Sequence, residues 1–201
     1  MQPARATGLL GFDVGIAANV VNIDTNASYW LHSVSSNNNL LVHGNYVGVP
    51  RLVVSKGFGA GTISGMYAKV SNSDIKTYGG ALDVPILRGS VVIPEVAFRG
   101  SYSTLSGEDV FKERVYGAEV FVSKGFGPLT PYGAVGRMRT DATGYPTNLN
   151  PTFAAIPPIT DRSNFNRYTL GVRLSLLVPK IVIEATQAEV RSYAAKISVG
   201  F

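Results

Sequence analysis

The sequence predicts an all-β fold, an antiparallel up-and-down transmembrane β-barrel of about ten strands. Three observations support this prediction. Apolar and polar residues alternate with a period of two over most of the 201 residues, and helical periodicity is scarce. Tight turns and longer polar connections alternate along the chain. Only 15% of the residues are charged, against about 25% in soluble domains.

Ten segments fit strands when the chain is divided at its turn-forming residues. They lie near 8–23, 48–57, 60–71, 75–87, 90–103, 112–126, 129–141, 164–178, 180–190 and 193–201. The alternative is eight strands, which follows if the two weakest segments, 48–57 and 180–190, do not pair. Residues 1–201 then form a single domain, which is an ordinary size for one barrel.

The alternation separates an apolar face from a polar face on each strand. In the last strand, one face consists of Tyr193, Ala195, Ile197, Val199 and Phe201, and the other of Ala194, Lys196, Ser198 and Gly200. The first strand places Phe12, Val14 and Ile16 opposite Asp13 and Gly15. Because side chains of a strand point alternately to its two sides, each strand has one face suited to an apolar environment.

The connections predict two different rims. Tight turns are expected at 57–61, 87–90, 125–128 and 178–180, and long external loops near 24–47 and 142–163. Shorter polar connections are expected at 72–74, at 104–111 and near Arg191. Short turns on one rim and long loops on the other are typical of outer-membrane barrels. An even number of strands places both chain ends on the short-turn rim.

Aromatic residues near the strand ends favour lipid over a second protein layer, although a soluble β-sandwich also alternates. A Tyr ring with one wet hydroxyl suits a membrane–water boundary. The girdle expected near the long loops consists of Tyr67, Tyr78, Tyr102, Tyr116, Tyr168 and Tyr193. The girdle expected near the short turns consists of Phe58, Phe126, Tyr132 and Phe201.

The segments 193–201 and 129–136 resemble those of bacterial outer-membrane β-barrel proteins. In that family a last strand that alternates and finishes in Phe is the signal read by the barrel-assembly machinery. The resemblance implies a bacterial outer-membrane location, outer-membrane lipid around the barrel, and both termini in the periplasm. It does not select a subfamily.

Charged residues on the polar faces predict a charged lumen. The lumen set consists of Arg99, Arg137, Arg139, Arg167, Arg173, Lys196, Glu95, Glu119, Glu184, Asp13 and Asp83. Arg137 and Arg139 are two residues apart, so both should point the same way. One interpretation is a narrow pore or small-molecule channel that favours anions. The other is a lumen filled by ion pairs, in a barrel that serves as a structural or docking protein.

The longest loops carry apolar residues that a solvated loop would not need. Trp30 lies in the first, and Tyr145, Phe153 and Ile156 lie in or beside the Pro-rich fourth. These residues predict a lid over the barrel mouth, a contact for a partner protein, or packing of the two loops on each other.

The remaining residues argue against other chemistry. His32 and His43 lie in a loop rich in Asn and Ser, which disfavours a catalytic site at the rim, so we predict no enzyme. Two histidines and no cysteine leave no convincing metal site, and no cofactor is expected. The net charge of +5 is scattered along the chain, which disfavours a nucleic-acid partner.

Overall fold

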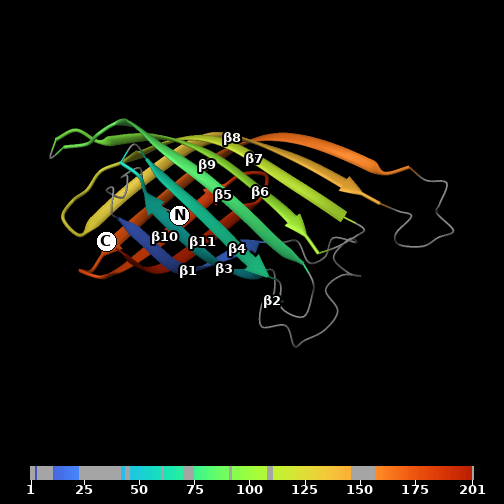
Figure 1. The fold of residues 1–201 in the computed structure, drawn as a ribbon, viewed down its shortest axis with the longest axis horizontal. Coiled ribbons are helices and arrows are strands. Elements are labelled where there is room, and N and C mark those ends of the chain that lie inside the picture. The colour runs from blue at the N-terminus through green and yellow to red at the C-terminus, as the bar shows by residue number, and fades with distance from the viewer. Residues whose placement is uncertain are drawn as a thin grey trace.

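The computed structural model describes residues 3, 11–22, 42–43, 46–59, 61–69, 75–90, 92–107, 111–145 and 157–200. Figure 1 shows long, tilted strands that wrap around one axis. The strands are β1 (Phe12–Asn22), β2 (Val42–His43), β3 (Tyr46–Gly57), β4 (Thr62–Lys69), β5 (Lys76–Leu87), β6 (Glu95–Ser106), β7 (Phe111–Ser123), β8 (Leu129–Gly144), β9 (Ile159–Ser175), β10 (Pro179–Gln187) and β11 (Arg191–Gly200). No helix long and apolar enough to cross a membrane occurs among these described residues.

The sheet closes on itself through its first strand. β1 pairs antiparallel with β11, from Asp13↔Gly200 to Val21↔Ser192, and on its other side with β3, from Phe12↔Lys56 to Asn22↔Tyr46. The remaining strands pair in chain order, so ten strands form a ring and the short β2 pairs with β3 beside it. Closure gives both edges of each strand in the ring a partner. The predicted barrel of about ten strands is confirmed.

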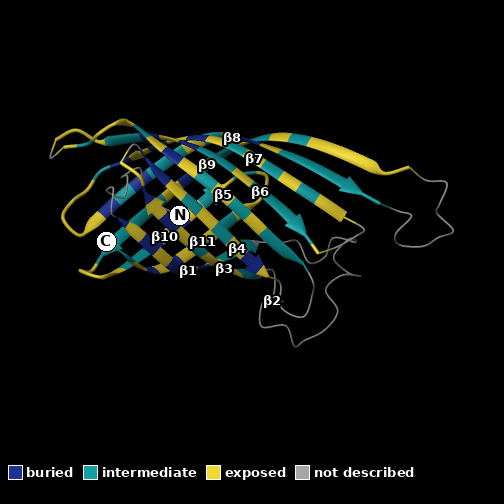
Figure 2. Cartoon of the chain, viewed as in Figure 1, coloured by how far each residue is buried: buried dark blue, intermediate teal, exposed yellow. Residues whose placement is uncertain are grey.

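The alternative of eight strands is wrong, because both segments in question pair on two sides. The segment 48–57 lies in β3, between β1 and β4, and the segment 180–190 contains most of β10, between β9 and β11. Both carry residues that alternate in burial, such as Val182 and Glu184, which are buried, and Ile183, which is exposed. Figure 2 shows the same alternation as a checkered pattern on the strands.

One rim of the barrel has short connections, and we call it the turn rim. Its connections are 58–61, 88–94, 124–128 and 176–178. We call the opposite rim the loop rim. Gly59 and Gly127 have φ angles of 81° and 58°, a region that glycine occupies at little cost.

The predicted strand 90–103 starts too early. The Ser90 hydroxyl accepts hydrogen bonds from the backbone N–H groups of Val92 and Ile93, at 3.3 and 3.2 Å, which holds these residues in a turn until β6 begins at Glu95.

β8 and β9 continue further toward the loop rim than the predicted strands 129–141 and 164–178. They have 16 and 17 residues and pair up to Gly144↔Ile159. The predicted loop 142–163 is therefore too long at both ends, and the connection runs from 145 to 158. The predicted loop 104–111 is also too long, because β6 and β7 leave only 107–110 between them.

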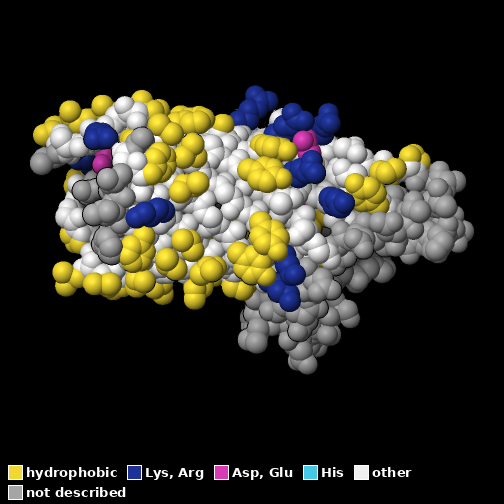
Figure 3. Space-filling model, viewed as in Figure 1, with side chains coloured by type: hydrophobic (Ala, Val, Ile, Leu, Met, Phe, Trp, Pro, Cys, Tyr) yellow, Lys and Arg dark blue, Asp and Glu magenta, His cyan; other side chains and the backbone are white. Residues whose placement is uncertain are grey.

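Large apolar side chains cover the outside of the barrel. Ile16, Leu170, Ile183 and Ile197 are each at least 59% exposed, and each lies in the middle of a strand. In Figure 3 hydrophobic side chains spread over the part of the visible face nearer the turn rim, and most Lys and Arg side chains gather nearer the loop rim. A barrel surrounded by water would rarely expose so continuous an apolar surface.

Candidate functional site

The lumen is the candidate site, and one buried cluster in it is apolar. Ala97, Phe121, Tyr132 and Val182 are buried to 4% exposure or less and pack as one cluster. They come from four different strands, β6, β7, β8 and β10. The Phe121 and Tyr132 ring centroids are 6.4 Å apart. This cluster occupies part of the lumen, as side chains do in other small barrels.

Tyr132 is the largest departure from the predicted girdles. The sequence places it near the short turns on the lipid side, whereas in the structure it is 4% exposed and points inward. Gly171 lies directly opposite on β9, and a Cβ atom there would overlap the Tyr132 ring. The absent side chain of Gly171 thus makes room for the ring, a pairing that single-strand periodicity does not reveal.

One group of ion pairs lies between the neighbouring strands β1, β11 and β10, toward the turn rim. The Lys196 Nζ donates to the Asp13 carboxylate at 2.7 Å, and the Ser198 hydroxyl donates to its other oxygen at 3.0 Å. The Lys180 Nζ lies 3.5 Å from the same carboxylate. Asp13 and Lys196 are 4% and 2% exposed, so both charges are compensated by a partner inside the barrel. Lys180 was not among the predicted lumen residues, because the sequence assigns it to a turn.

A second network lies in the middle of the lumen. Arg99 donates two hydrogen bonds to Asp83, from Nε at 2.5 Å and from Nη2 at 2.8 Å, and its Cζ lies 4.1 Å from the centroid of the Phe121 ring. The bidentate geometry is the strongest that a guanidinium and a carboxylate can form. It locks Arg99 against β5 and leaves its charge compensated.

Glu184 and Glu119 complete this network. The Tyr132 hydroxyl donates to Glu184 at 2.7 Å, and Arg167 lies 4.0 Å from Glu184 and 3.4 Å from Glu119. Glu119 and Glu184 are 2% and 5% exposed. One arginine thus bridges two buried carboxylates on strands β7 and β10, across the inside of the barrel.

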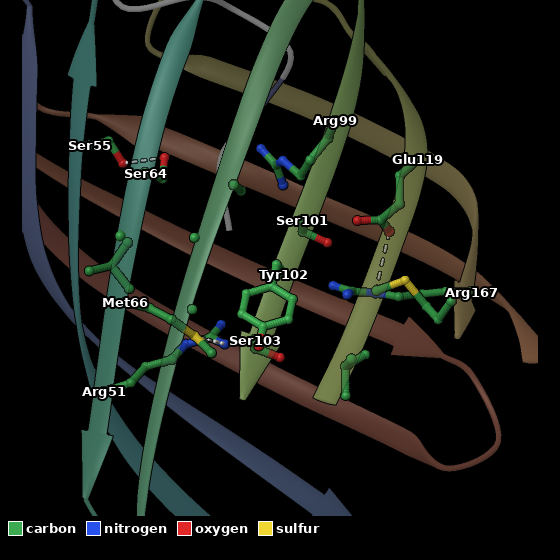
Figure 4. Close-up of a pocket in the computed structure, with 17 residues that line it drawn as sticks. Arg51, Ser55, Ser64, Met66, Arg99, Ser101, Tyr102, Ser103, Glu119 and Arg167 are labelled. Carbon is green, nitrogen blue, oxygen red and sulfur yellow. Dashed lines mark hydrogen bonds and ion pairs between the residues drawn. The ribbon is translucent and has the colours of Figure 1, made fainter. Parts of the chain in front are cut away.

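A cavity of about 270 Å³ lies on the loop side of the Phe121–Tyr132 cluster. Its walls combine small residues with three arginines, as the close-up in Figure 4 shows. The small residues include Ser55, Ser64, Gly79, Ser101 and Ser103. Because such side chains are short, they leave room for this cavity inside the barrel.

Arg51 differs from the other two arginines of the cavity wall, because no described carboxylate forms a direct ion pair with it. Its Nε is buried and has no hydrogen-bond partner among the described residues, and its Nη1 lies 4.0 Å from the Met66 sulfur. Arg99 and Arg167, the other two arginines on the wall, each face a carboxylate. The charge of the buried Glu184 acts on Arg51 and offsets part of its positive charge, although no described carboxylate forms a direct ion pair with it. The inward position of Arg51 follows from the alternation of β3.

Two predicted lumen residues are in the wrong place. Arg137 and Arg139 are exposed on the outer face of β8, on the same side as Val135, while Tyr132 and Met138 point inward. Their cross-strand neighbours on β7, Ala118 and Tyr116, are also exposed. The prediction that both arginines share one side is correct, but that side is the exterior. The remaining predicted lumen residues lie at inward positions: Arg99, Arg167, Arg173, Lys196, Glu95, Glu119, Glu184, Asp13 and Asp83.

The predicted loop-rim girdle lies on the outside of the barrel. Tyr67 and Tyr78 form one ring pair at 5.4 Å, and Tyr102 and Tyr116 form another at 5.2 Å. Tyr168 and Tyr193 are 53% and 52% exposed. Phe201 lies outside the described residues.

The predicted lid residues are mostly not described. Trp30, Phe153, Ile156 and His32 lie outside the described residues, as does the side chain of His43. Tyr145 is half-buried, with the Lys112 Nζ 5.4 Å from its ring centroid. Among the described residues no three His, Cys, Asp or Glu side chains lie close enough to hold a metal ion.

Comparison with known proteins finds structural neighbours without close sequence relatives. No protein-family model and no curated protein matches the chain. The N-terminal β-barrel domain of Pseudomonas aeruginosa OprF matches at 10% identity and a TM-score of 0.40, over 96% of this chain and 98% of that one. The KdgM porin matches at 10% identity and a TM-score of 0.42, over 94% and 99%.

The Acinetobacter baumannii outer membrane protein Omp33 matches at 8% identity and a TM-score of 0.38, over 98% of this chain and 100% of that one. These neighbours are bacterial outer-membrane barrels, the class that the sequence resembles. At such identities and TM-scores the likeness does not extend to solute, ligand or partner.

Proposed function

We propose that this chain is a barrel of the bacterial outer membrane that forms a narrow pathway for small anionic solutes, with the turn rim in the periplasm. The exposed apolar outer face supports the membrane placement, because hydrocarbon covers such a surface at no cost in hydration. The closed ring supports it as well, since every strand in a bilayer needs its backbone groups paired.

The anionic preference rests on one observation, the Arg51 guanidinium at the cavity wall. Its Nε lacks a hydrogen-bond partner among the described side chains, and a buried donor of this kind is satisfied by a bound anion or by water. The lumen as a whole supports no broader positive field. Among the described residues the inward cations and carboxylates are equal in number: Arg51, Arg99, Arg167, Arg173, Lys180 and Lys196 against Asp13, Asp83, Glu95, Glu113, Glu119 and Glu184. Selection by charge is therefore local to the cavity and is not a property of an arginine-lined pore.

The Phe121–Tyr132 cluster is the restriction of this pathway. A solute that enters the 270 Å³ cavity from the loop side meets this layer and the Glu184–Arg167–Glu119 network before it reaches the turn rim. We therefore expect a small conductance for the wild-type barrel in a planar bilayer.

Two variants test this assignment. Removing the ring in Tyr132→Ala should raise single-channel conductance several-fold, because the cluster then no longer obstructs the lumen with this large side chain.

Arg51→Gln should leave conductance similar and shift the reversal potential in a salt gradient toward zero, because the cavity wall loses the positive charge of Arg51. Each protein is first checked for detergent dependence and for a gel mobility that changes on boiling in SDS. A folded barrel that stays silent in both wild type and Tyr132→Ala contradicts the pathway. A chain that remains monodisperse without detergent contradicts the membrane placement itself.

A non-conducting barrel that docks a partner through its external loops is the second candidate. The tight packing of Phe121 against Tyr132 and Val182 favours it, since a filled layer needs no pathway. The silent outcome above, with a barrel that is correctly folded, is the result expected for this candidate.

A further inference from the structure

The outer face of the barrel carries a basic cluster near the loop rim, formed by Lys112, Arg114, Arg137, Arg139 and Arg162. These five side chains are exposed on three neighbouring strands, β7, β8 and β9. Asp141 lies among them, with the Arg139 Nε donating to it at 3.0 Å and the Arg162 Nε 3.6 Å away. One carboxylate among five cations leaves the cluster strongly positive.

The cluster begins where the apolar outer face ends. Along the outer face of β8 the order from the turn rim is Val135, Arg137, Arg139, and the outer face of β9 changes from Leu170 and Tyr168 to Asn166 and Asn164. On β7 the change occurs at Tyr116, directly opposite Arg139. An arginine facing lipid is costly at the centre of a bilayer and nearly free at its boundary, so this line marks the boundary on this wall.

We propose that the basic cluster binds the phosphate of lipid headgroups in the leaflet at the loop rim. This inference rests on the proposed membrane placement. Arg137 is the first exposed cation after Val135 on the outer face of β8, so it lies where the apolar surface ends, the level that a lipid phosphate occupies. The guanidinium matches phosphate in a two-point geometry that Lys lacks, and four of the five cations are arginines. The neighbouring Tyr116 and Tyr102 rings supply an apolar wall for the upper part of the lipid chain.

Other occupants fit less well. A soluble acidic protein would have to dock against a surface whose lower half is apolar and covered by lipid. Free phosphate would meet the same cations but would gain nothing from the adjoining tyrosines. Charge and apolar surface therefore point together to a ligand that contains both a phosphate and acyl chains.

The test measures lipid retention by the detergent-solubilised barrel with native mass spectrometry. The probes are phosphatidic acid, diacylglycerol with the same acyl chains, and inorganic phosphate. We expect wild type to retain phosphatidic acid far better than diacylglycerol, with little displacement by inorganic phosphate. The R137Q/R139Q variant should bind phosphatidic acid on the order of tenfold more weakly, since each surface cation contributes modestly to headgroup attraction.

The matched control is K69Q/K76Q. Lys69 and Lys76 are cross-strand partners on β4 and β5, next to the Tyr67–Tyr78 pair, so the control removes the same charge from another wall of the barrel. We expect its phosphatidic acid binding to match wild type.

Equal binding of phosphatidic acid by R137Q/R139Q and by wild type overturns the proposal. Retention of diacylglycerol equal to that of phosphatidic acid overturns it as well. Binding of inorganic phosphate as tight as that of the lipid overturns the lipid assignment. A boiling-dependent gel shift in every variant shows that the barrel has folded, so these outcomes are separate from failure of the membrane placement.

Discussion

The contact between Asp83 and Arg99 illustrates how a residue inside the barrel depends on its partner. Both side chains are nearly buried, and two hydrogen bonds join them. Asp83→Asn removes the negative charge and leaves a buried guanidinium without compensation, so we expect a loss of about 3–5 kcal/mol in the free energy of unfolding. Urea titration of the barrel in lipid vesicles measures this loss.

Asp141→Asn is the matched control for that substitution. Asp141 forms ion pairs too, with Arg139 and Arg162. Its side chain is 25% exposed, and those of the two arginines are 49% and 68% exposed. Water screens such pairs, so the control should cost less than about 1 kcal/mol. Equal losses for the two substitutions would show that the Asp83–Arg99 pair is not shielded from water.

Position along a strand decided which residue predictions were correct. In β1 and β11 the outer residues next to Asp13 and Lys196 are apolar, namely Phe12, Val14, Ala195 and Ile197, so the inward positions of the two charges followed from alternation alone. In β8 the outer face changes from Val135 to Arg137 partway along the strand. Alternation assigns charge to the lumen only while hydrocarbon covers the other face. Beyond the bilayer boundary water covers it, and an arginine is as stable outside as inside.

The β8–β9 hairpin shows the same boundary at the scale of an element. Its outer part, 142–144 on β8 and 159–163 on β9, adds strand residues that the sequence assigned to a loop. This part contains Thr143, Thr160, Asp161, Arg162 and Ser163, a composition that resembles a polar connection. Pairing between two strands stabilises it in water without a buried apolar face, so the loss of hydrophobic alternation gave a false strand end.

Shortening this hairpin tests whether its outer part contributes to barrel closure. Thr140 and Ser163 are cross-strand partners, so residues 141–162 can be replaced by Asn-Gly, a dipeptide suited to a two-residue hairpin turn. We expect the shortened chain still to fold, because the rest of β8 pairs with β7 and β9 below this point. Its gel mobility should change on boiling in SDS as for wild type. Loss of that shift would mean that the outer hairpin is required for the ring to close.

At the scale of the whole molecule, the number of strands and their direction followed from the sequence, whereas the contacts across the lumen did not. Alternation and turn residues are local signals, and each strand carries its own. The cavity near Arg51 and the filled layer at Tyr132 arise from residues on strands far apart in the chain. Their packing depends on glycines such as Gly171 opposite a large ring, and one sequence read strand by strand does not contain that information.

Closure itself can be tested at the seam between the first and last strands. Val14 and Val199 are cross-strand partners on the outer face, and the chain contains no cysteine. Residues paired across antiparallel strands have Cα atoms about 4.5–5.5 Å apart, within the range that a disulfide spans. The variant V14C/V199C should therefore form an intramolecular disulfide on mild oxidation of the folded barrel. After boiling without reductant, the cross-linked chain is nearly circular and should migrate differently from the reduced chain.

V14C/I181C is the control. Ile181 lies on β10, which is two strands from β1, so the backbones at positions 14 and 181 are about 9 Å or more apart. Efficient cross-linking of both pairs, or of neither, would contradict the β1–β11 register and with it the closed ring from which the lumen, the outer face and both proposals follow.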